Sequence, residues 1–216
     1  LPAKKLVWFL DDPHFFVDQK LEPDEHVFSF DETYVQYLQG FQPGSCGFMA
    51  LAADMQQAGT YDSAYACDLS FVGGLIDQTQ RRQQLSPGMR DYIDRIVEEK
   101  MNRPYLTFDE LVIQFPIEEG KAIQLNPQVI HYLYWETNNR YRIRMLEALT
   151  GFDLRIYGNA DWETVARDSD LLNYFHGPAD PVTELPKIFA SSAVNINIHS
   201  VQCRGSMNQR DFNAPM

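Results

Sequence analysis

Two aspartates and a histidine follow the first strongly apolar run of the chain. Residues 6–10 (LVWFL) contain no polar side chain, which is typical of a strand covered on both faces in a parallel sheet. Asp11, Asp12, Pro13 and His14 come directly after it. The carboxyl ends of strands line the ligand crevice in open α/β sheets, so these carboxylates and this imidazole are candidates for acid–base chemistry. The alternative is that the aspartates end the strand and begin a turn with Pro13.

A second group, suited to binding an anion, lies near the end of the sequence. Ser206 and Gln209 have the spacing of a capping box, which predicts a helix that begins at Met207. Asn208 and Arg210 fall in its first turn, where unpaired N–H groups and an arginine fork suit a phosphate or diphosphate. The alternative is a capped surface helix with a solvated arginine.

The segments that must position these residues alternate between strand and helix patterns. Apolar runs and alternation predict strands at residues 6–10, 26–30, 47–51, 68–72, 153–157, 173–176 and 193–198. Capping residues and helical apolar spacing predict helices at residues 31–40, 87–101, 107–115, 127–150 and 183–191. Strands and helices that alternate at short spacing indicate βαβ units. We therefore predict an α/β fold with parallel sheets and a helical block between the first two strands of its second half.

Two glycines, Gly73 and Gly74, follow the predicted strand at residues 68–72. Glycine lets the backbone approach a ligand closely, whereas the alternative is a tight turn without a ligand.

Three arginines lie in the predicted long helix. Arg140 and Arg144 share a face and Arg142 points away from it. This spacing favours a solvated face over a phosphate clamp.

Composition and charge restrict the classes of partner. The 216 residues are 44% apolar and 13% aromatic, which is enough for one large or two small cores. Eighteen basic and 30 acidic residues give a net charge of −12, and no basic segment offsets it. This argues against nucleic acid as a partner.

Cysteine and histidine positions argue against a disulfide framework and a zinc site. Cys46, Cys67 and Cys203 lack C-x-x-C spacing, and the five histidines are scattered. No apolar run approaches the roughly 18 residues of a membrane span, and no signal peptide is visible. We expect no transmembrane segment, a cytoplasmic location, and a fragment of a longer protein, since the sequence begins at Leu1.

Several motifs of the second half together resemble a known family. They are Tyr157-Gly158, residues 174–178 (YFHGP), 184–186 (ELP), 195–197 (NIN) and 208–212 (NQRDF). They are similar to motifs of the CgeB-like, or spore-maturation-protein-like, glycosyltransferases, which are relatives of the GT-B sugar-nucleotide transferases. In that family an N-x-N strand leads to a helix with an arginine, a phenylalanine and an acidic residue, and then to a glycine pair. Asn213 stands where the acidic residue usually lies, and the sequence ends at Met216, before the glycines.

The resemblance implies two Rossmann-like halves in a GT-B-like arrangement, both incomplete. Residues 1–66 would be the later part of the acceptor-side domain, and residues 67–216 the nucleotide-sugar donor domain without its C-terminal end. The implied reaction transfers a sugar from a nucleotide-diphosphate sugar to a hydroxyl acceptor, with no metal ion or other cofactor. Asp11, Asp12 or His14 would supply the base. The implied donor-binding residues are Gly73, Gly74, Tyr157, Gly158, His176, Gly177, Asn208, Arg210 and Asn213.

Two other classes are weighed against this one. The start of the chain also resembles the first strand and acidic pair of a phospho-acceptor receiver domain, and Asp54 falls near the position of its phosphorylated aspartate. Residues 13–25 show no helical stripe, however, and Lys100 lies inside a predicted helix and not at a strand end. The receiver remains the non-enzymatic alternative, together with another nucleotide-binding α/β module. A nicotinamide-dependent Rossmann enzyme would need G-x-G-x-x-G, which the sequence lacks.

Overall fold

The computed structural model describes residues 5–13, 20–52, 59–118, 127–208 and 211. We refer to residues 5–52 as the first half and to residues 59–211 as the second half. The strands of the chain are β1 (Leu6–Phe9), β2 (His26–Ser29), β3 (Ser45–Phe48), β4 (Cys67–Val72), β5 (Leu154–Tyr157) and β6 (Ser192–Ile196). Its α-helices are α1 (Val35–Gln39), α2 (Thr79–Gln84), α3 (Pro87–Asn102), α4 (Phe108–Gln114), α5 (Pro127–Glu147), α6 (Asp161–Val165) and α7 (Leu185–Ser191). Short 3-10 helices span Glu32–Tyr34, Ser63–Tyr65 and Asp170–Tyr174.

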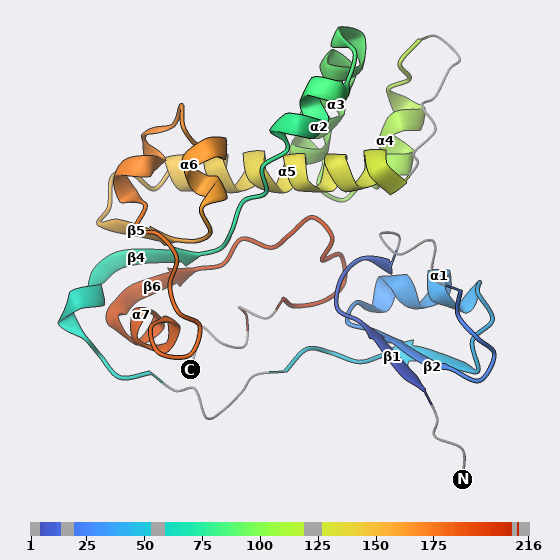
Figure 1. Cartoon of the computed structure of the whole chain (residues 1–216), viewed down its shortest axis with the longest axis horizontal. Coiled ribbons are helices and arrows are strands. Elements are labelled where there is room, and N and C mark those ends of the chain that lie inside the picture. Colours follow the sequence, from blue (N-terminus) through green and yellow to red (C-terminus); the bar gives the residue numbers. More distant parts are fainter. Residues whose placement is uncertain (1–4, 14–19, 53–58, 119–126, 209–210, 212–216) are drawn as a thin grey trace.

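Each half contains one parallel sheet of three strands, as Figure 1 shows. In the first half the strand order is β1-β2-β3, and in the second it is β5-β4-β6. Val27 in β2 pairs with Val7 and Cys46 on the two sides, and Phe71 in β4 pairs with Ile156 and Ile196. The predicted α/β class with parallel sheets is therefore confirmed.

The first sheet has one small apolar core. Phe9, Val27 and Leu38 are buried together, so that α1 covers one face of the sheet. The prediction that residues 6–10 are covered on both faces is wrong, because Leu6 and Leu10 are 60% and 52% exposed. The physical reason is that successive side chains of β1 point to opposite faces, and only the face of Val7 and Phe9 packs in the core with α1.

The second sheet is covered by α5, α6 and the adjoining segments. Phe71, Ile156, Trp162 and Leu171 belong to one buried cluster between sheet and helices. A second cluster joins α3, α4 and the beginning of α5, and forms the helical block above the sheet in Figure 1. The position of this block between β4 and β5 agrees with the predicted element order.

Capping residues in the sequence correctly predicted where α3 and α4 of this block begin. The Ser86 side chain accepts the N–H of Met89 at the start of α3. Thr107 and Glu110 form a reciprocal capping box at the start of α4. Asp31 likewise caps the 3-10 turn that leads into α1. The helices α2 and α6 had no such signal and were not predicted.

Two other expectations about local structure need correction. The third strand ends at Phe48 and not at residue 51. Asn173 and Tyr174 lie in a 3-10 helix, and Phe175 makes only a single bridge to Ile156. Ser169 caps that 3-10 helix through the N–H of Leu171, and this local bond competes with strand pairing.

The helix expected to begin at Met207 does not begin there. Ser206 and Met207 are not helical, and the N–H of Asn208 is accepted by the Asp211 carboxylate at 2.7 Å. The Ser206 hydroxyl instead donates to Asp31 of the first half, at 3.2 Å. Gln209, the other member of the predicted capping box, lies outside the described residues.

The arginines of α5 all bind groups of the protein; Arg144 is exposed, whereas Arg140 and Arg142 are only partly exposed, so the predicted solvated face holds for Arg144 alone. Arg140 pairs with Asp94 of α3, and Arg144 pairs with Glu98 one turn further along α3. Arg142 donates to the carbonyl of Gly74. These bonds fix α5 to α3 and to the segment after β4, which is why none of the three is available as a phosphate clamp.

Candidate functional site

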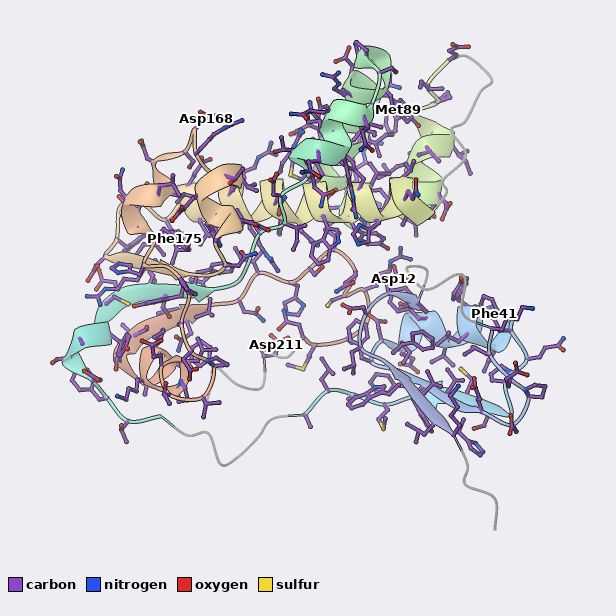
Figure 2. The ribbon with its side chains drawn as sticks, viewed as in Figure 1. Asp12, Phe41, Met89, Asp168, Phe175 and Asp211 are labelled. Carbon is purple, nitrogen blue, oxygen red and sulfur yellow. The ribbon has the colours of Figure 1, made fainter. Side chains whose placement is uncertain are left out.

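The segment that follows β6 connects the two halves and organises the candidate site. It leaves the second sheet at Ile196 and passes between the halves in Figure 1. Residues 199–207 then contact the first half, as the hydrogen bonds and cavities below show. Figure 2 places Asp12 on the first half and Asp211 between the halves.

A buried carboxylate of the first half holds this segment in place. Asp31 is 0% exposed, and its Oδ2 accepts the N–H groups of Arg204 and Gly205 at 2.7 and 2.9 Å. Its Oδ1 accepts the N–H and the hydroxyl of Thr33 at 2.9 and 2.7 Å. Burial raises the pKa of Asp31, but the hydrogen bonds from Gly205, Thr33 and Arg204 outweigh it and lower that pKa below its usual value. The carboxylate therefore binds the loop as an anion.

A second contact between the halves uses Asp12. The Tyr34 hydroxyl lies 3.0 Å from Asp12 Oδ2 and 2.7 Å from the Gln202 carbonyl, to which it donates. Burial, together with Tyr134 and Asp12, raises the pKa of Tyr34, so its hydroxyl stays protonated. Asp12 itself is 0% exposed. It is a buried acceptor and does not line either cavity described below.

The first cavity has a volume of about 460 Å³ and opens between the carboxyl ends of the two sheets. The first half contributes residues at or after the ends of β2 and β3, and the second half contributes the segment after β6. The lining residues are Phe30, Phe48, Ala50, Leu51, His199, Cys203, Arg204, Gly205, Ser206 and Met207.

A histidine and an aspartate face each other beside this cavity. His199 Nε2 lies 2.9 Å from Asp211 Oδ2, and the His199 side chain is 41% exposed. Asp211 also accepts the Asn197 amide at 2.6 Å and the Asn208 N–H at 2.7 Å. The amide side chains of Asn197 and Asn208 bond each other in both directions, at 3.1 and 3.2 Å. This network fixes the Asp211 carboxylate against one ring nitrogen and leaves the imidazole accessible.

The second cavity, of about 380 Å³, lies against the helical block and shares His199, Cys203 and Arg204 with the first. The Arg204 guanidinium donates to the Tyr134 hydroxyl at 2.9 Å and lies 5.6 Å from the Tyr34 ring centre. Among the described residues it has no carboxylate at ion-pair distance, so its charge is available at the point where the cavities meet.

Cys203 lines both cavities but is not a nucleophile. Burial first, and then nearby Asp31, Asp211 and Asp11, raise the pKa of its thiol to about 12. The thiolate is the reactive form of cysteine, so at neutral pH this side chain is inert.

The predicted glycines and their neighbours form a separate cluster at the ends of β4 and β5. The Gly73 carbonyl accepts the Trp162 indole N–H at 2.8 Å, and its N–H donates to the Tyr157 carbonyl. A side-chain carbon on Gly158 would lie 2.4 Å from Trp162 Nε1, so this glycine is required by packing. Gly74 binds Arg142 through its carbonyl, as described above.

His176 and Gly177 complete the same cluster. The His176 ring stacks near Tyr157 at 5.6 Å between centres, and burial lowers its pKa, which favours the neutral ring. Gly177 has a φ of +83°, a conformation that favours glycine, and its carbonyl accepts the Gly158 N–H at 3.0 Å. The polar backbone groups named here are bound within the protein.

The remaining predicted residues lie nearer the cavities or outside the description. Asp11 accepts the Gln202 amide at 3.1 Å at the junction, and Asn208 belongs to the network around Asp211. His14, Arg210 and Asn213 lie outside the described residues.

Five residues that line the cavities or hold the lining segment in place were missed as site residues from the sequence. They are Asp31, Lys100, His199, Arg204 and Asp211. Asp31 was recognised only as a helix cap, and no local pattern shows that it binds a segment 173 residues away. The alternation N-x-N-x-H at residues 195–199 was the one available signal, because it places His199 on the amide-bearing side of the strand.

In the described part of the chain, no group of three or more His, Cys, Asp or Glu could hold a metal ion. No helix there has the length and apolar character needed to cross a bilayer. Comparisons with protein-family models, with curated proteins and with solved structures found no match to this chain.

Proposed function

We propose that this chain is part of a GT-B-type glycosyltransferase, which transfers a sugar from a nucleotide-diphosphate sugar to a hydroxyl-bearing acceptor. One observation carries the proposal. The carboxyl ends of two parallel sheets meet at one cavity, and that cavity presents an arginine and a histidine–aspartate pair. Ligands of open α/β sheets bind at such carboxyl ends.

Arg204 supplies the positive charge in this scheme. A departing nucleoside diphosphate carries negative charge, and a guanidinium stabilises it through two parallel hydrogen bonds. Arg204 is held by Tyr134 and stands beside Tyr34, which limits its conformational freedom. In this scheme Arg204, and not a metal ion, stabilises the charge of the departing diphosphate.

His199 supplies the acid–base function. A general base must reach the acceptor hydroxyl, and His199 lines the cavity with its ring accessible. Asp211 holds the opposite ring nitrogen and stabilises the imidazolium that forms when His199 takes the proton. The sequence offered Asp11, Asp12 and His14 as candidates for the base. Asp12 is buried, so this assignment replaces it; Asp11 stays a candidate, and His14 lies outside the described residues.

Nucleotide-dependent thermal stability tests the proposal. A uridine, guanosine or thymidine diphosphate at about 100 times its Kd should add about 2.7 kcal/mol of stability. NAD and acetyl phosphate should add none. A melting temperature that is unchanged across the nucleotide panel, in folded protein, would refute the proposal. Stabilisation by beryllofluoride with Mg²⁺ would instead support the receiver alternative.

A further inference from the structure

We propose that the second cavity is a binding site for a small organic phosphate monoester. The proposal stands on the charges and the lining of this cavity and does not depend on glycosyl transfer. The lining residues are Lys100, Met101, Pro104, Tyr105, Thr137, Tyr141, His199, Ser200, Val201, Cys203 and Arg204.

Among the described residues, two cations line this cavity and no carboxylate does, in a protein whose net charge is −12. Lys100 and Arg204 are those cations. Asp12 and Glu110 act on them electrostatically, but neither lines the cavity. A phosphate monoester has a charge of about −1.5 to −2 at pH 7, which matches the two positive charges, whereas a carboxylate supplies only one.

Lys100 is buried and incompletely bound. It is 3% exposed, and its Nζ donates to the carbonyls of Pro104 and Leu106 at 2.7 and 2.5 Å. An ammonium has three N–H bonds, so these two carbonyls leave one for a ligand. Among the described residues, neither Lys100 nor Arg204 has a carboxylate at ion-pair distance, and for Lys100, which is buried, an unpaired charge is costly.

The rest of the lining suits the organic part and the phosphoryl oxygens. Ser200 Oγ accepts the Asn138 amide at 2.9 Å, which leaves its own proton for donation to a ligand. Met101, Val201 and the tyrosine rings supply apolar contact. A volume of about 380 Å³ is at the small end of ligand pockets, so the ligand is small.

Burial and the repulsion of Arg204 lower the pKa of Lys100 to about 8, while Glu110 opposes the shift. A bound dianion favours the ammonium form, so binding above this pH requires proton uptake. The groups that face Lys100 are Arg204 from the segment after β6, Glu110 from α4, Tyr141 from α5, and Tyr105, His199 and Cys203 in the same wall. Of these, Cys203 stays neutral because its pKa is raised to about 12.

Calorimetric titration with phenyl phosphate, benzoate and phenol tests the proposal. Phenyl phosphate should bind at pH 7.5 at least about tenfold more tightly than benzoate, because it engages both cations. Phenol should show no saturable binding. Equal affinities for phenyl phosphate and benzoate, or no saturable binding of either, would overturn the proposal.

Two variants test whether phenyl phosphate binds in the second cavity. Lys100→Met keeps the length of the side chain and should weaken phenyl phosphate binding about tenfold or more, as loss of a charge-assisted bond predicts. Arg144→Met removes an exposed arginine that pairs with Glu98 and should leave binding unchanged. If Lys100→Met binds like the wild type, the site is refuted.

The pH dependence of phenyl phosphate binding to the wild-type protein tests the proposal even if Lys100→Met does not fold. Phenyl phosphate is already a dianion above pH 7, so its affinity should fall only as pH rises through about 8, with measurable proton uptake there. An affinity that stays constant from pH 7 to 10 would overturn the role of Lys100.

A variant of the other cavity separates this proposal from the glycosyltransferase proposal. Ala50 lines only the first cavity, and Ala50→Trp should narrow it. Phenyl phosphate binding should be unchanged in this variant, while nucleotide binding should be lost. Loss of phenyl phosphate binding in Ala50→Trp would place the anion in the first cavity and overturn the present inference.

Discussion

Replacing Asp31 by alanine should destabilise the protein far more than the loss of an ordinary helix cap. Asp31 performs two tasks, since it caps a 3-10 turn through Thr33 and binds Arg204, Gly205 and Ser206 of the other half. Asp62 provides a matched control. It caps the 3-10 helix Ser63–Tyr65 through the Ala64 N–H at 3.0 Å, but does not reach the first half.

The difference between the two variants measures the contact between the halves. Loss of a cap costs about 1 kcal/mol, which is the expected effect of Asp62→Ala. Hydrogen bonds to a charged group are worth about 1.5–3 kcal/mol each. Arg204 and Gly205 are exposed, so water can reach their N–H groups after the substitution, and we use the lower value. Asp31→Ala should therefore cost about 4 kcal/mol in total.

Urea denaturation measures both losses, with the free energy of unfolding extrapolated to water. Hydrogen exchange of the Arg204 and Gly205 amides should accelerate in Asp31→Ala and not in Asp62→Ala. If the two variants lose stability within about 1 kcal/mol of each other, or the amides of the loop stay protected, Asp31 does not hold the halves together.

Four further outcomes are expected. Acid should weaken the contact that Asp31 makes between the halves. Because the pKa of Asp31 is lowered on folding, its contribution to stability is present above the usual pKa of 3.8 and is lost as pH falls through the folded pKa. Acid titration of Asp31→Asn should lack this loss of stability. The pH dependence of stability that Lys100 causes has the opposite cause, since burial lowers its pKa from 10.5 to about 8 on folding. The stability of the wild type relative to Lys100→Met should therefore rise by about 3 kcal/mol between pH 7 and 11. A stability difference that does not change with pH would contradict the burial argument. His199→Asn should lower the transfer rate of the intact enzyme about 100-fold or more with little change in nucleotide affinity, and an unchanged rate would exclude this base. Nucleotide binding should persist in EDTA, and its abolition would show that the metal-free assignment is wrong.

Helix starts in the helical block were predictable because their causes are local. The bond from Met89 N–H to Ser86 and the capping box of Thr107 and Glu110 each join residues three positions apart. Their energies do not depend on how the rest of the chain folds. The apolar stripe of α3 then buries Ile93 and Ile96 in the second cluster, as the spacing required.

The same kind of signal failed where a distant partner competed for the capping side chain. Ser206 has the sequence of a cap, but its hydroxyl binds Asp31, which lies 175 residues away. Periodicity in the last residues of the chain contains no information on this contact. The predicted burial of β1 was wrong for a related reason, since an apolar run does not show whether other parts of the chain cover both faces of its sheet.

The candidate site was predictable only in its general location. Strand ends followed by polar residues directed attention to the segment after β6, which lines both cavities of the structure. The glycines at the ends of β4 and β5 looked equally favourable, yet Trp162 fills the space beside Gly73 and Gly158. The sequence does not distinguish a glycine that leaves room for a packed tryptophan from a glycine that lets a ligand approach the backbone.

The central claim is that a nucleotide-diphosphate sugar binds at the cavity between the halves. Glycine-selective ¹⁵N labelling tests it directly, because the 12 glycines are distributed over both candidate regions and over distant helices. On titration with the nucleotide that stabilises the protein, the amide signal of Gly205 should shift, while Gly88 at the start of α3 should not. Shifts of Gly73 and Gly158 without Gly205 would place the nucleotide at the other strand ends, and an unchanged spectrum would exclude binding; either result contradicts the claim.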